Sequence, residues 1–269
     1  MNSQKTLVVC DIDGTILNNN HKLTQTTIDG LTKLRSQYSN LILCLVTGRN
    51  WEETQEIYQQ LNLDTVAVCC NSCQIVKPND PTFSPRYFTF DKSFLQSIFN
   101  DQVFVDQMEW TVVTTVEKTY NLHSSQEIND FLINYYNSCH HEVAYIRTKF
   151  KNRSLVNYLF SHIKNIATTL LIQCWEYENS DVFFMEIGVP YATKKLGVEF
   201  LSSYYNVDYQ NIYIFGDNIN DLTMLKMPCN TYALSNGVTQ AKIYAKKITD
   251  KSNSEDGVIH ELFKVFPVK

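Results

Sequence analysis

Short apolar runs alternate with amphipathic segments over the first 80 residues, and this alternation restricts the possible folds more than any other feature of the sequence. Three runs are predicted to be buried strands: LVVC (7–10), LILCLV (41–46) and VAVCC (66–70). Between them lie two predicted helices, 21–38 with Thr24 as N-cap and 50–61 with an acidic first turn. The order strand–helix–strand–helix–strand predicts a parallel sheet with helices on both faces.

The pattern is interrupted near residue 78, where KPNDPTFSP (77–85) carries three prolines and is predicted to be a linker. The following hundred residues mix β-prone runs with helical segments and are predicted to form a separate α+β domain. The β-prone runs are 103–117, 142–150 and 181–187, and the helical segments are 125–138 and 154–165. His140 and His141 are expected at a helix end.

After Pro190 the first pattern returns, with a predicted helix at 194–205 and a predicted strand at 211–217. The sequence therefore predicts an α/β chain whose Rossmann-like parallel-sheet core is formed by residues 1–82 and 189–269. The α+β domain, residues 83–188, is expected to be an insertion in this core.

The composition is that of an ordinary globular protein, with 44% hydrophobic and 19% charged residues. A net charge of −5 argues against nucleic-acid binding. The first apolar run is too short for a secretory signal, and no run approaches the roughly 20 residues of a membrane span. We therefore expect a cytoplasmic protein with no nucleic-acid or membrane partner, and no protein partner is implied.

Eight cysteines are scattered along the chain, several of them inside apolar runs. Cys70 and Cys73 form a C-x-x-C pair, CNSC, but no second pair or histidine cluster follows at zinc-ligand spacing. We interpret these cysteines as buried or loop thiols, with a zinc or redox role as the alternative.

Polar side chains follow three of the predicted core strands, at the point where each strand ends. The segments are DIDGT after the first strand, TGR after the second and GDNIND after the late one. Each alone could be a turn, but ligands of an open parallel sheet bind at the carboxyl ends of its strands. Four converging carboxylates repel one another, and oxygen-only ligands favour Mg²⁺ as the compensating cation. The residues expected to converge are Asp11, Asp13, Thr47, Asp217 and Asp221.

Four segments together resemble the motifs of the haloacid dehalogenase (HAD) superfamily: DIDGTIL, VTGR, the lysine that ends MEIGVPYATK, and GDNINDLTML. Their order and spacing are most similar to the Cof-like, type IIB phosphatases, and the tail TDKSNSEDGVIHEL extends the resemblance to the end of the chain. The resemblance implies that residues 83–188 form an αβ cap over a phosphoryl-transfer core.

The resemblance also implies a role for each motif residue. Asp11 would be the nucleophile that forms an aspartyl-phosphate, and Asp13 the general acid and base. Mg²⁺ would be held by the side chains of Asp11 and Asp217 and by the backbone carbonyl of Asp13. Asp221 would orient the motif lysine or a metal-bound water. The phosphoryl oxygens would be contacted by Thr47, Gly48, Lys194 and Asn220.

Three positions bear on the details of this assignment. Lys195 stands where the family usually has glycine, so Lys194 and Lys195 could exchange roles; we favour Lys194 as the phosphate ligand. Ser72 replaces the glycine of the family's Asn-Gly pair, which puts substrate specificity in doubt. Arg49 is expected to pair with a carboxylate of the cap or the core, and it is a further candidate for substrate specificity.

The segment YIRTKFKNR places four cations at a spacing of two: Arg147, Lys149, Lys151 and Arg153. If the segment is a strand, all four lie on one face. Such a face could protect a sheet edge from aggregation, or it could attract an anionic substrate. Arg147 and Lys149 are therefore candidates for substrate specificity.

The function expected from these residues is Mg²⁺-dependent hydrolysis of small phosphorylated metabolites, such as sugar phosphates. One alternative is a phosphomutase of the same fold, which would keep water from the intermediate. Another is a sugar-phosphate-binding regulator without turnover, although both aspartates of DIDGT are intact. The natural substrate is not defined by these motifs, because one fold hosts many substrates.

Overall fold

The computed structural model describes residues 4–137, 142–175, 181 and 183–268; His140 and His141 lie outside these ranges. The chain divides into two compact units. The first, which we call the core, comprises Met1–Arg86 and Thr193–Lys269, and the second, the cap, comprises Tyr87–Ala192. The sequence predicted boundaries after residues 82 and 188, and each of these lies four residues before the boundary in the structure, which follows Arg86 or Ala192.

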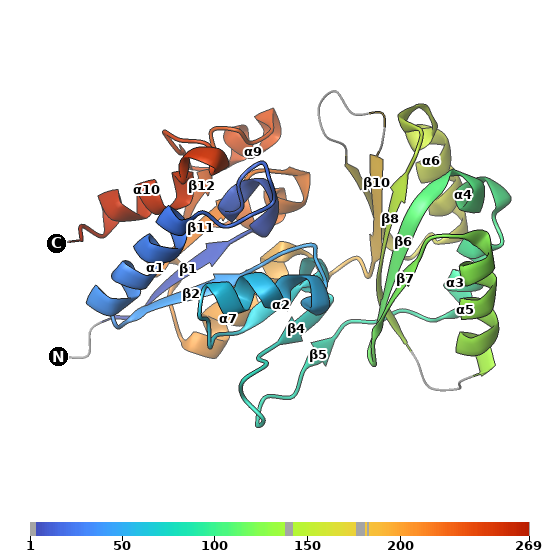
Figure 1. Cartoon of the computed structure of the whole chain (residues 1–269), viewed down its shortest axis with the longest axis horizontal. Helices are drawn as coiled ribbons and strands as arrows, with labels where there is room; N and C mark the ends of the chain where they lie inside the picture. Colours follow the sequence, from blue (N-terminus) through green and yellow to red (C-terminus); the bar gives the residue numbers. More distant parts are fainter. Residues whose placement is uncertain (1–3, 138–141, 176–180, 182, 269) are drawn as a thin grey trace. The chain divides into compact units, whose positions relative to one another are not determined.

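A five-stranded parallel sheet forms the centre of the core, with the strand order β13-β12-β11-β1-β2 (Figure 1). Its strands are β1 (Thr6–Cys10), β2 (Leu41–Leu45), β11 (Ile212–Gly216), β12 (Asn230–Ala233) and β13 (Lys247–Ile248). Val8 of β1 is paired with Leu43 on one side and with Tyr213 on the other. Continuous apolar runs suit these strands because helices cover both faces of the sheet. The predicted α/β fold class is confirmed.

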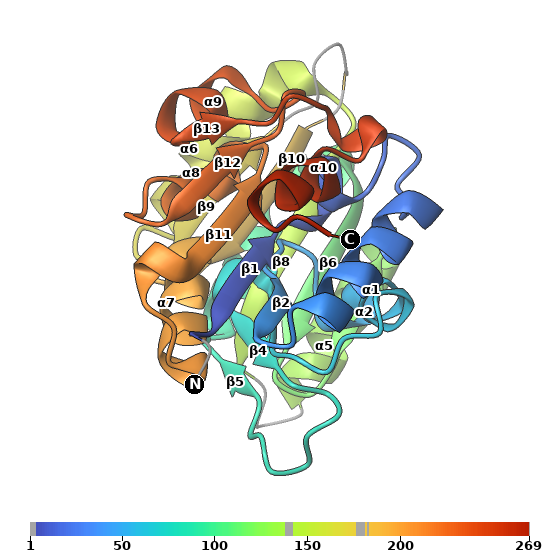
Figure 2. The same ribbon diagram turned by 90° about the vertical axis from the view of Figure 1, so that its left-hand side faces the viewer.

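Helices α1, α2 and α10 cover one face of the core sheet, and α7 and α8 cover the other (Figure 2). The core helices are α1 (Gln25–Gln37), α2 (Trp51–Gln60), α7 (Lys194–Tyr205), α8 (Leu222–Leu225), α9 (Thr239–Tyr244) and α10 (Gly257–Val265). Thr24 is the N-cap of α1, as predicted, and its hydroxyl accepts a hydrogen bond from the Thr27 N–H at 3.0 Å. Asn50 and Glu53 form a capping box at the start of α2.

The third predicted strand does not join the parallel sheet as expected. β3 (Ala67–Cys69) forms one parallel bridge, from Val68 to Val46, the residue that directly follows β2. Its other pairing is antiparallel, with β4 (Gln74–Val76). The chain reverses between them in the turn Cys70–Ser72, whose three residues all have positive φ angles. This reversal explains why β3 ends after three residues. Both cysteines of the CNSC pair are buried here.

The cap contains a five-stranded antiparallel sheet, in the order β7-β6-β8-β10-β9, with its helices on one face (Figure 1). The short strand β5 (Arg86–Tyr87) spans the boundary before it. The cap strands are β6 (Met108–Thr115), β7 (Thr119–Leu122), β8 (Val143–Phe150), β9 (Leu171–Trp175) and β10 (Phe183–Gly188). The cap helices are α3 (Ser93–Phe99), α4 (Gln102–Gln107), α5 (Ser125–Asn137) and α6 (Val156–Ile166).

The β-prone run 103–117 is only partly a strand, since its first residues form α4. The Asp101 side chain caps this helix by accepting a hydrogen bond from the Phe104 N–H at 2.7 Å. Phe104 in turn packs edge-on against Phe150 of β8. The N-cap hydrogen bond of Asp101 and the packing of Phe104 outweigh the strand preference of the valines. Among the residues described, no helix has the length and apolar character needed to cross a membrane.

Candidate active site

The loop after β1 is held against the loop after β11. Asp11 directly follows β1, is buried, and donates its backbone N–H to the carbonyl of Phe215 at 3.1 Å. Gly14 turns the chain with a φ of +73°, and a Cβ at this position would lie 2.3 Å from Asp217 Oδ2. The Thr15 hydroxyl donates to Asp217 Oδ1 at 2.7 Å. The two strand ends therefore bring Asp11 and Asp217 to one edge of the sheet.

Lys194 is the first residue of α7 and crosses the buried interior to reach these carboxylates. Its side chain is 0% exposed, and Nζ donates to Asp11 Oδ1 at 2.6 Å and to Asp221 Oδ1 at 2.5 Å. Burial alone would lower the pKa of Lys194, but the two carboxylates outweigh it and raise this pKa above its ordinary value. Lys195 is 55% exposed and lies 3.5 Å from Glu199. The structure thus brings Lys194, and not Lys195, into contact with Asp11 and Asp221.

Asp221 has hydrogen-bond donors at both carboxylate oxygens. Oδ1 accepts from Lys194, and Oδ2 accepts from the backbone N–H groups of Asp217 and Asn218 at 2.7 and 2.9 Å. A fully buried carboxylate requires such compensation. Asp221 therefore links Lys194 to the backbone of the loop that carries Asp217.

Three buried carboxylates share this site with too little positive charge. One oxygen each of Asp11, Asp217 and Asp221 lies within 4.8 Å of the others. In the described part of the chain, Lys194 is the one cation that contacts them, so two negative charges are unbalanced when all three carboxylates are ionised. Burial raises the pKa of Asp11 to about 7, with Lys194 opposing the shift. Burial and the neighbouring carboxylates also raise the pKa of Asp217 well above its ordinary value.

Two carboxylate oxygens of this cluster, one from Asp11 and one from Asp217, fit a hard divalent cation. Asp11 Oδ2 and Asp217 Oδ2 accept no hydrogen bond from any described residue, whereas the other oxygens of the cluster do. A cation with two positive charges would balance the cluster. Oxygen-only donors of this kind suit Mg²⁺.

Asp13 forms a two-point ion pair with Arg49. Arg49 Nε donates to Asp13 Oδ2 at 2.7 Å, and Nη2 donates to Oδ1 at 2.5 Å. His21 Nδ1 lies 3.5 Å from Oδ1. Burial opposes the charge of Arg49, but the Asp13 carboxylate outweighs it and raises the pKa of the guanidinium. Arg49 therefore pairs with a core carboxylate, which joins the loops after β1 and β2.

Thr47 and Asn220 are linked through Asn71, the asparagine that precedes Ser72 and that was not among the expected site residues. Thr47 is buried, its hydroxyl accepts from the Arg49 N–H at 3.1 Å, and its carbonyl accepts from the Asn71 N–H at 2.9 Å. The Asn220 amide donates to Asn71 Oδ1 at 3.4 Å. Gly48 lies between Thr47 and Arg49 in this loop. The sequence signals for Asn71 are its place in the family's Asn-Gly pair and its residue type, since asparagine tolerates the left-handed conformation that it adopts here.

The basic segment of the cap differs from the expectation in two respects. β8 ends at Phe150, so Arg147 and Lys149 share a face of the strand while Lys151 and Arg153 lie beyond its end. β8 is the central strand of its sheet, so the edge-protection explanation is wrong. Lys149 pairs with Glu109 at 2.8 Å, and the Arg147 guanidinium lies 5.5 Å from the centre of the Trp110 ring.

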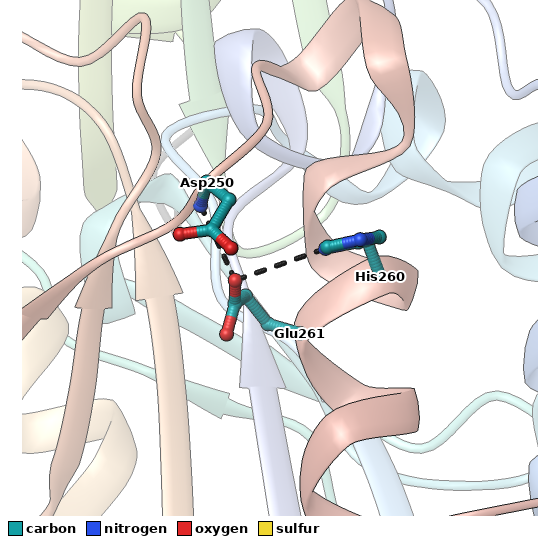
Figure 3. Close-up of side chains that lie close together, drawn as sticks. All are labelled: Asp250, His260 and Glu261. Atoms are coloured by element: carbon teal, nitrogen blue, oxygen red, sulfur yellow. Dashed lines mark hydrogen bonds and ion pairs between the residues drawn. The ribbon is translucent and has the colours of Figure 1, made fainter.

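A second group of possible metal ligands lies near the C-terminus of the core. It consists of Asp250, which follows β13, and of His260 and Glu261 of α10 (Figure 3). Here Lys264 Nζ lies 2.5 Å from Asp250 Oδ2 and 2.6 Å from Glu261 Oε1. The Asp250 N–H also donates to Glu261 Oε1 at 3.2 Å. One lysine thus contacts both carboxylates, and the group is an ion-pair network that attaches α10 to the loop after β13.

Comparison with known proteins finds relatives and solved structures that cover nearly the whole chain. A relative from Bacillus subtilis, the 5-amino-6-(5-phospho-D-ribitylamino)uracil phosphatase YitU, is 26% identical over 289 residues, covering 99% of each chain. A solved haloacid dehalogenase-like hydrolase from B. subtilis superposes with a TM-score of 0.78 at 18% identity, over 96% of this chain and 98% of the other. Another from Bacteroides thetaiotaomicron superposes with a TM-score of 0.77 at 17% identity, over 98% and 100%.

The family model for haloacid dehalogenase-like hydrolases matches residues 8–262, which include the cap and most of both core segments. The resemblance identified from the sequence motifs is therefore confirmed. The chain belongs to the haloacid dehalogenase-like hydrolase family.

Proposed function

We propose that the protein is a Mg²⁺-dependent phosphatase of small phosphorylated metabolites, such as sugar phosphates, and that it acts through an aspartyl-phosphate. The observation that carries this proposal is the buried contact between Asp11 and Lys194 at 2.6 Å, within a cluster that lacks two positive charges. The name of the B. subtilis relative, a phosphatase of a phosphorylated ribitylamino compound, supports the substrate class.

In the first step, a carboxylate oxygen of Asp11 attacks phosphorus and the bond from phosphorus to the leaving oxygen breaks. Asp13 gives its proton to that oxygen. In the second step, Asp13 takes a proton from water, the water oxygen bonds to phosphorus, and the bond to Asp11 breaks. The carboxylate form of Asp13, which takes the proton from water, is the form that pairs with Arg49.

Repulsion between a carboxylate and a phosphate dianion opposes the first step, and several residues reduce it. Lys194 places its ammonium charge on the phosphoryl oxygens. The Thr47 hydroxyl, the Gly48 N–H and the Asn220 amide donate hydrogen bonds to them. When bound by the side chains of Asp11 and Asp217 and the carbonyl of Asp13, Mg²⁺ would supply the remaining positive charge.

Replacing Lys194 with methionine is expected to lower kcat/KM by at least about 10²-fold, because the phosphoryl group loses the charge that offsets its own. The melting temperature should also fall, since Asp11 and Asp221 lose their shared cation. Lys195→Met is the matched control, and its kcat/KM should stay within about twofold of wild type because its ion pair is exposed. The opposite ranking in a phosphate-release assay would assign the phosphate contact to Lys195.

For the cap, we propose that Arg147 and Lys149 attract anionic substrates. The variant Arg147→Gln/Lys149→Gln should lower kcat/KM for a multiply charged phosphate ester, with little effect on a small aryl phosphate. Added salt should reduce the difference, since screening weakens long-range attraction in wild type. Lys151→Gln/Arg153→Gln removes the same charge from beyond the end of β8 and serves as control. Equal losses on both substrates would contradict this role.

The test of the function is a panel of phosphorylated sugars, nucleotides and cofactors, assayed for phosphate release with the Asp11→Asn variant as blank. Release from small phosphate esters supports a phosphatase. Isomerisation that a sugar bisphosphate stimulates, with little free phosphate, would instead indicate a phosphomutase. Binding without either reaction would indicate a regulator.

A further inference from the structure

The turn Cys70–Ser72 has an unusual backbone for a segment without glycine. Its three residues have φ angles of +51°, +48° and +84°, and all three are buried. Side chains with a Cβ avoid this left-handed region, so the surrounding structure must stabilise the conformation. Strained turns of this kind are concentrated at functional sites, which prompts the question of what Ser72 contributes.

The hydroxyl of Ser72 reaches the start of the helix that carries Lys194. Ser72 Oγ donates to the backbone carbonyl of Thr193 at 2.7 Å, and Thr193 is the N-cap of α7. This carbonyl belongs to the peptide group that joins Thr193 to Lys194, so the hydrogen bond restrains the backbone from which the lysine side chain starts. The Thr193 side chain makes no capping hydrogen bond of its own.

The first turn of α7 also packs closely on Ser72. A Cβ at Gly197 would lie 2.7 Å from Ser72 Oγ and 2.6 Å from Val68 Cγ1, so glycine is needed for this approach. At its far end, the Lys194 side chain contacts both Asp11 and Asp221. One end of Lys194 is therefore held by carboxylates and the other by the strained turn.

We propose that Ser72 is a positioning residue that holds Lys194 in register with Asp11 through its hydrogen bond to Thr193. The proposal rests on the function assigned above to Lys194. It explains why a serine occupies a left-handed position that glycine would adopt with less strain: the hydroxyl is required there.

Two variants separate the hydroxyl from the backbone strain. Ser72→Ala removes the hydroxyl and keeps a Cβ in the left-handed conformation, whereas Ser72→Gly removes the hydroxyl and relieves the strain. If Ser72 positions Lys194, both variants should lose kcat by on the order of 10-fold, because small displacements of a catalytic group are costly. Both should also bind inorganic phosphate, measured as a competitive inhibitor, more weakly than wild type. Their melting temperatures should differ, with the glycine variant the more stable.

Ser202→Ala is the matched control within the same helix. Ser202 Oγ donates to the Val207 carbonyl at 2.7 Å, at the opposite end of α7 from Lys194. Its loss should affect the melting temperature without lowering kcat or weakening phosphate inhibition. A crystal structure of Ser72→Gly gives a readout that does not depend on activity, namely the distances from Lys194 Nζ to Asp11 and Asp221, at least one of which should lengthen.

The proposal is overturned if activity follows the melting temperature, with Ser72→Gly equal to wild type and Ser72→Ala impaired. It is also overturned if both variants keep wild-type kcat, or if Nζ stays in place in the Ser72→Gly structure. These outcomes leave the proposed function intact when wild type releases phosphate and Asp11→Asn does not. Conversely, a wild-type protein without phosphatase activity would remove the proposed function, while the Nζ distances would still decide whether Ser72 places Lys194.

Discussion

Asp11→Asn is expected to abolish phosphate release while leaving the fold intact. The amide is nearly the same shape as the carboxylate but is a poor nucleophile, so the aspartyl-phosphate cannot form. The variant removes one of three mutually repelling buried carboxylates and leaves Lys194 its contact with Asp221. Without divalent metal, its melting temperature should therefore be equal to that of wild type or higher. Phosphate release and thermal unfolding, measured on the same preparations, check both halves of this expectation.

Asp13→Asn is the companion variant, because it removes the proton donor and keeps the nucleophile. Its turnover should fall by at least the ~10²-fold that is usual for the loss of general acid–base catalysis. An Asp11→Asn protein that retained more than a trace of wild-type activity, in a preparation free of contaminating phosphatase, would rule out the covalent mechanism. Wild-type turnover in Asp13→Asn would remove Asp13 from the acid and base role.

Chelation of divalent metal is expected to reduce turnover to background, and added Mg²⁺ should restore it. When ionised, Asp11, Asp217 and Asp221 carry two more negative charges than Lys194 offsets, and a phosphate dianion would add to this repulsion. Ca²⁺ should substitute poorly, since it prefers more ligands at longer distances and would misplace Asp11 relative to phosphorus. Assays in chelator, with each metal added back in turn, measure this dependence.

A stability measurement gives a second test of the metal site. Mg²⁺ should raise the melting temperature of wild type, because it binds the folded cluster and not the unfolded chain. Asp217→Asn should lose most of this shift. Asp250→Asn is the matched control, because Asp250 is an exposed carboxylate that already pairs with Lys264, and its Mg²⁺ response should resemble that of wild type. Full turnover in chelator, or an unchanged shift in Asp217→Asn, would exclude the proposed site.

The parts of this fold that could be predicted from the sequence are those determined by local pattern. Apolar runs defined β1, β2 and β11, and parallel pairing places their carboxyl ends at one edge, so the meeting of Asp11 with Asp217 could be expected. The Thr24 cap of α1 could be predicted for the same reason, because a cap depends on its nearest neighbours along the chain.

The features that could not be predicted depend on long-range pairing or on backbone geometry. The central place of β8 follows from its pairing with β6 and β10, which a basic run with period two does not reveal. The reversal after β3 requires positive φ angles at residues that usually avoid them. The choice between Lys194 and Lys195 depends on which side of α7 faces the carboxylates, and the sequence favoured Lys194 without excluding Lys195.

The strand order of the core also has a consequence for the order in which the two units can fold during synthesis. β1 lies between β2 and β11, and Leu7 of β1 pairs with Ile212, which the ribosome adds only after the whole cap. The cap is one continuous stretch of the chain, and all its strands are synthesised before β11, so it can fold first. Until β11 emerges, β1 has an unpaired edge of apolar residues, and the nascent chain is exposed to aggregation during that interval.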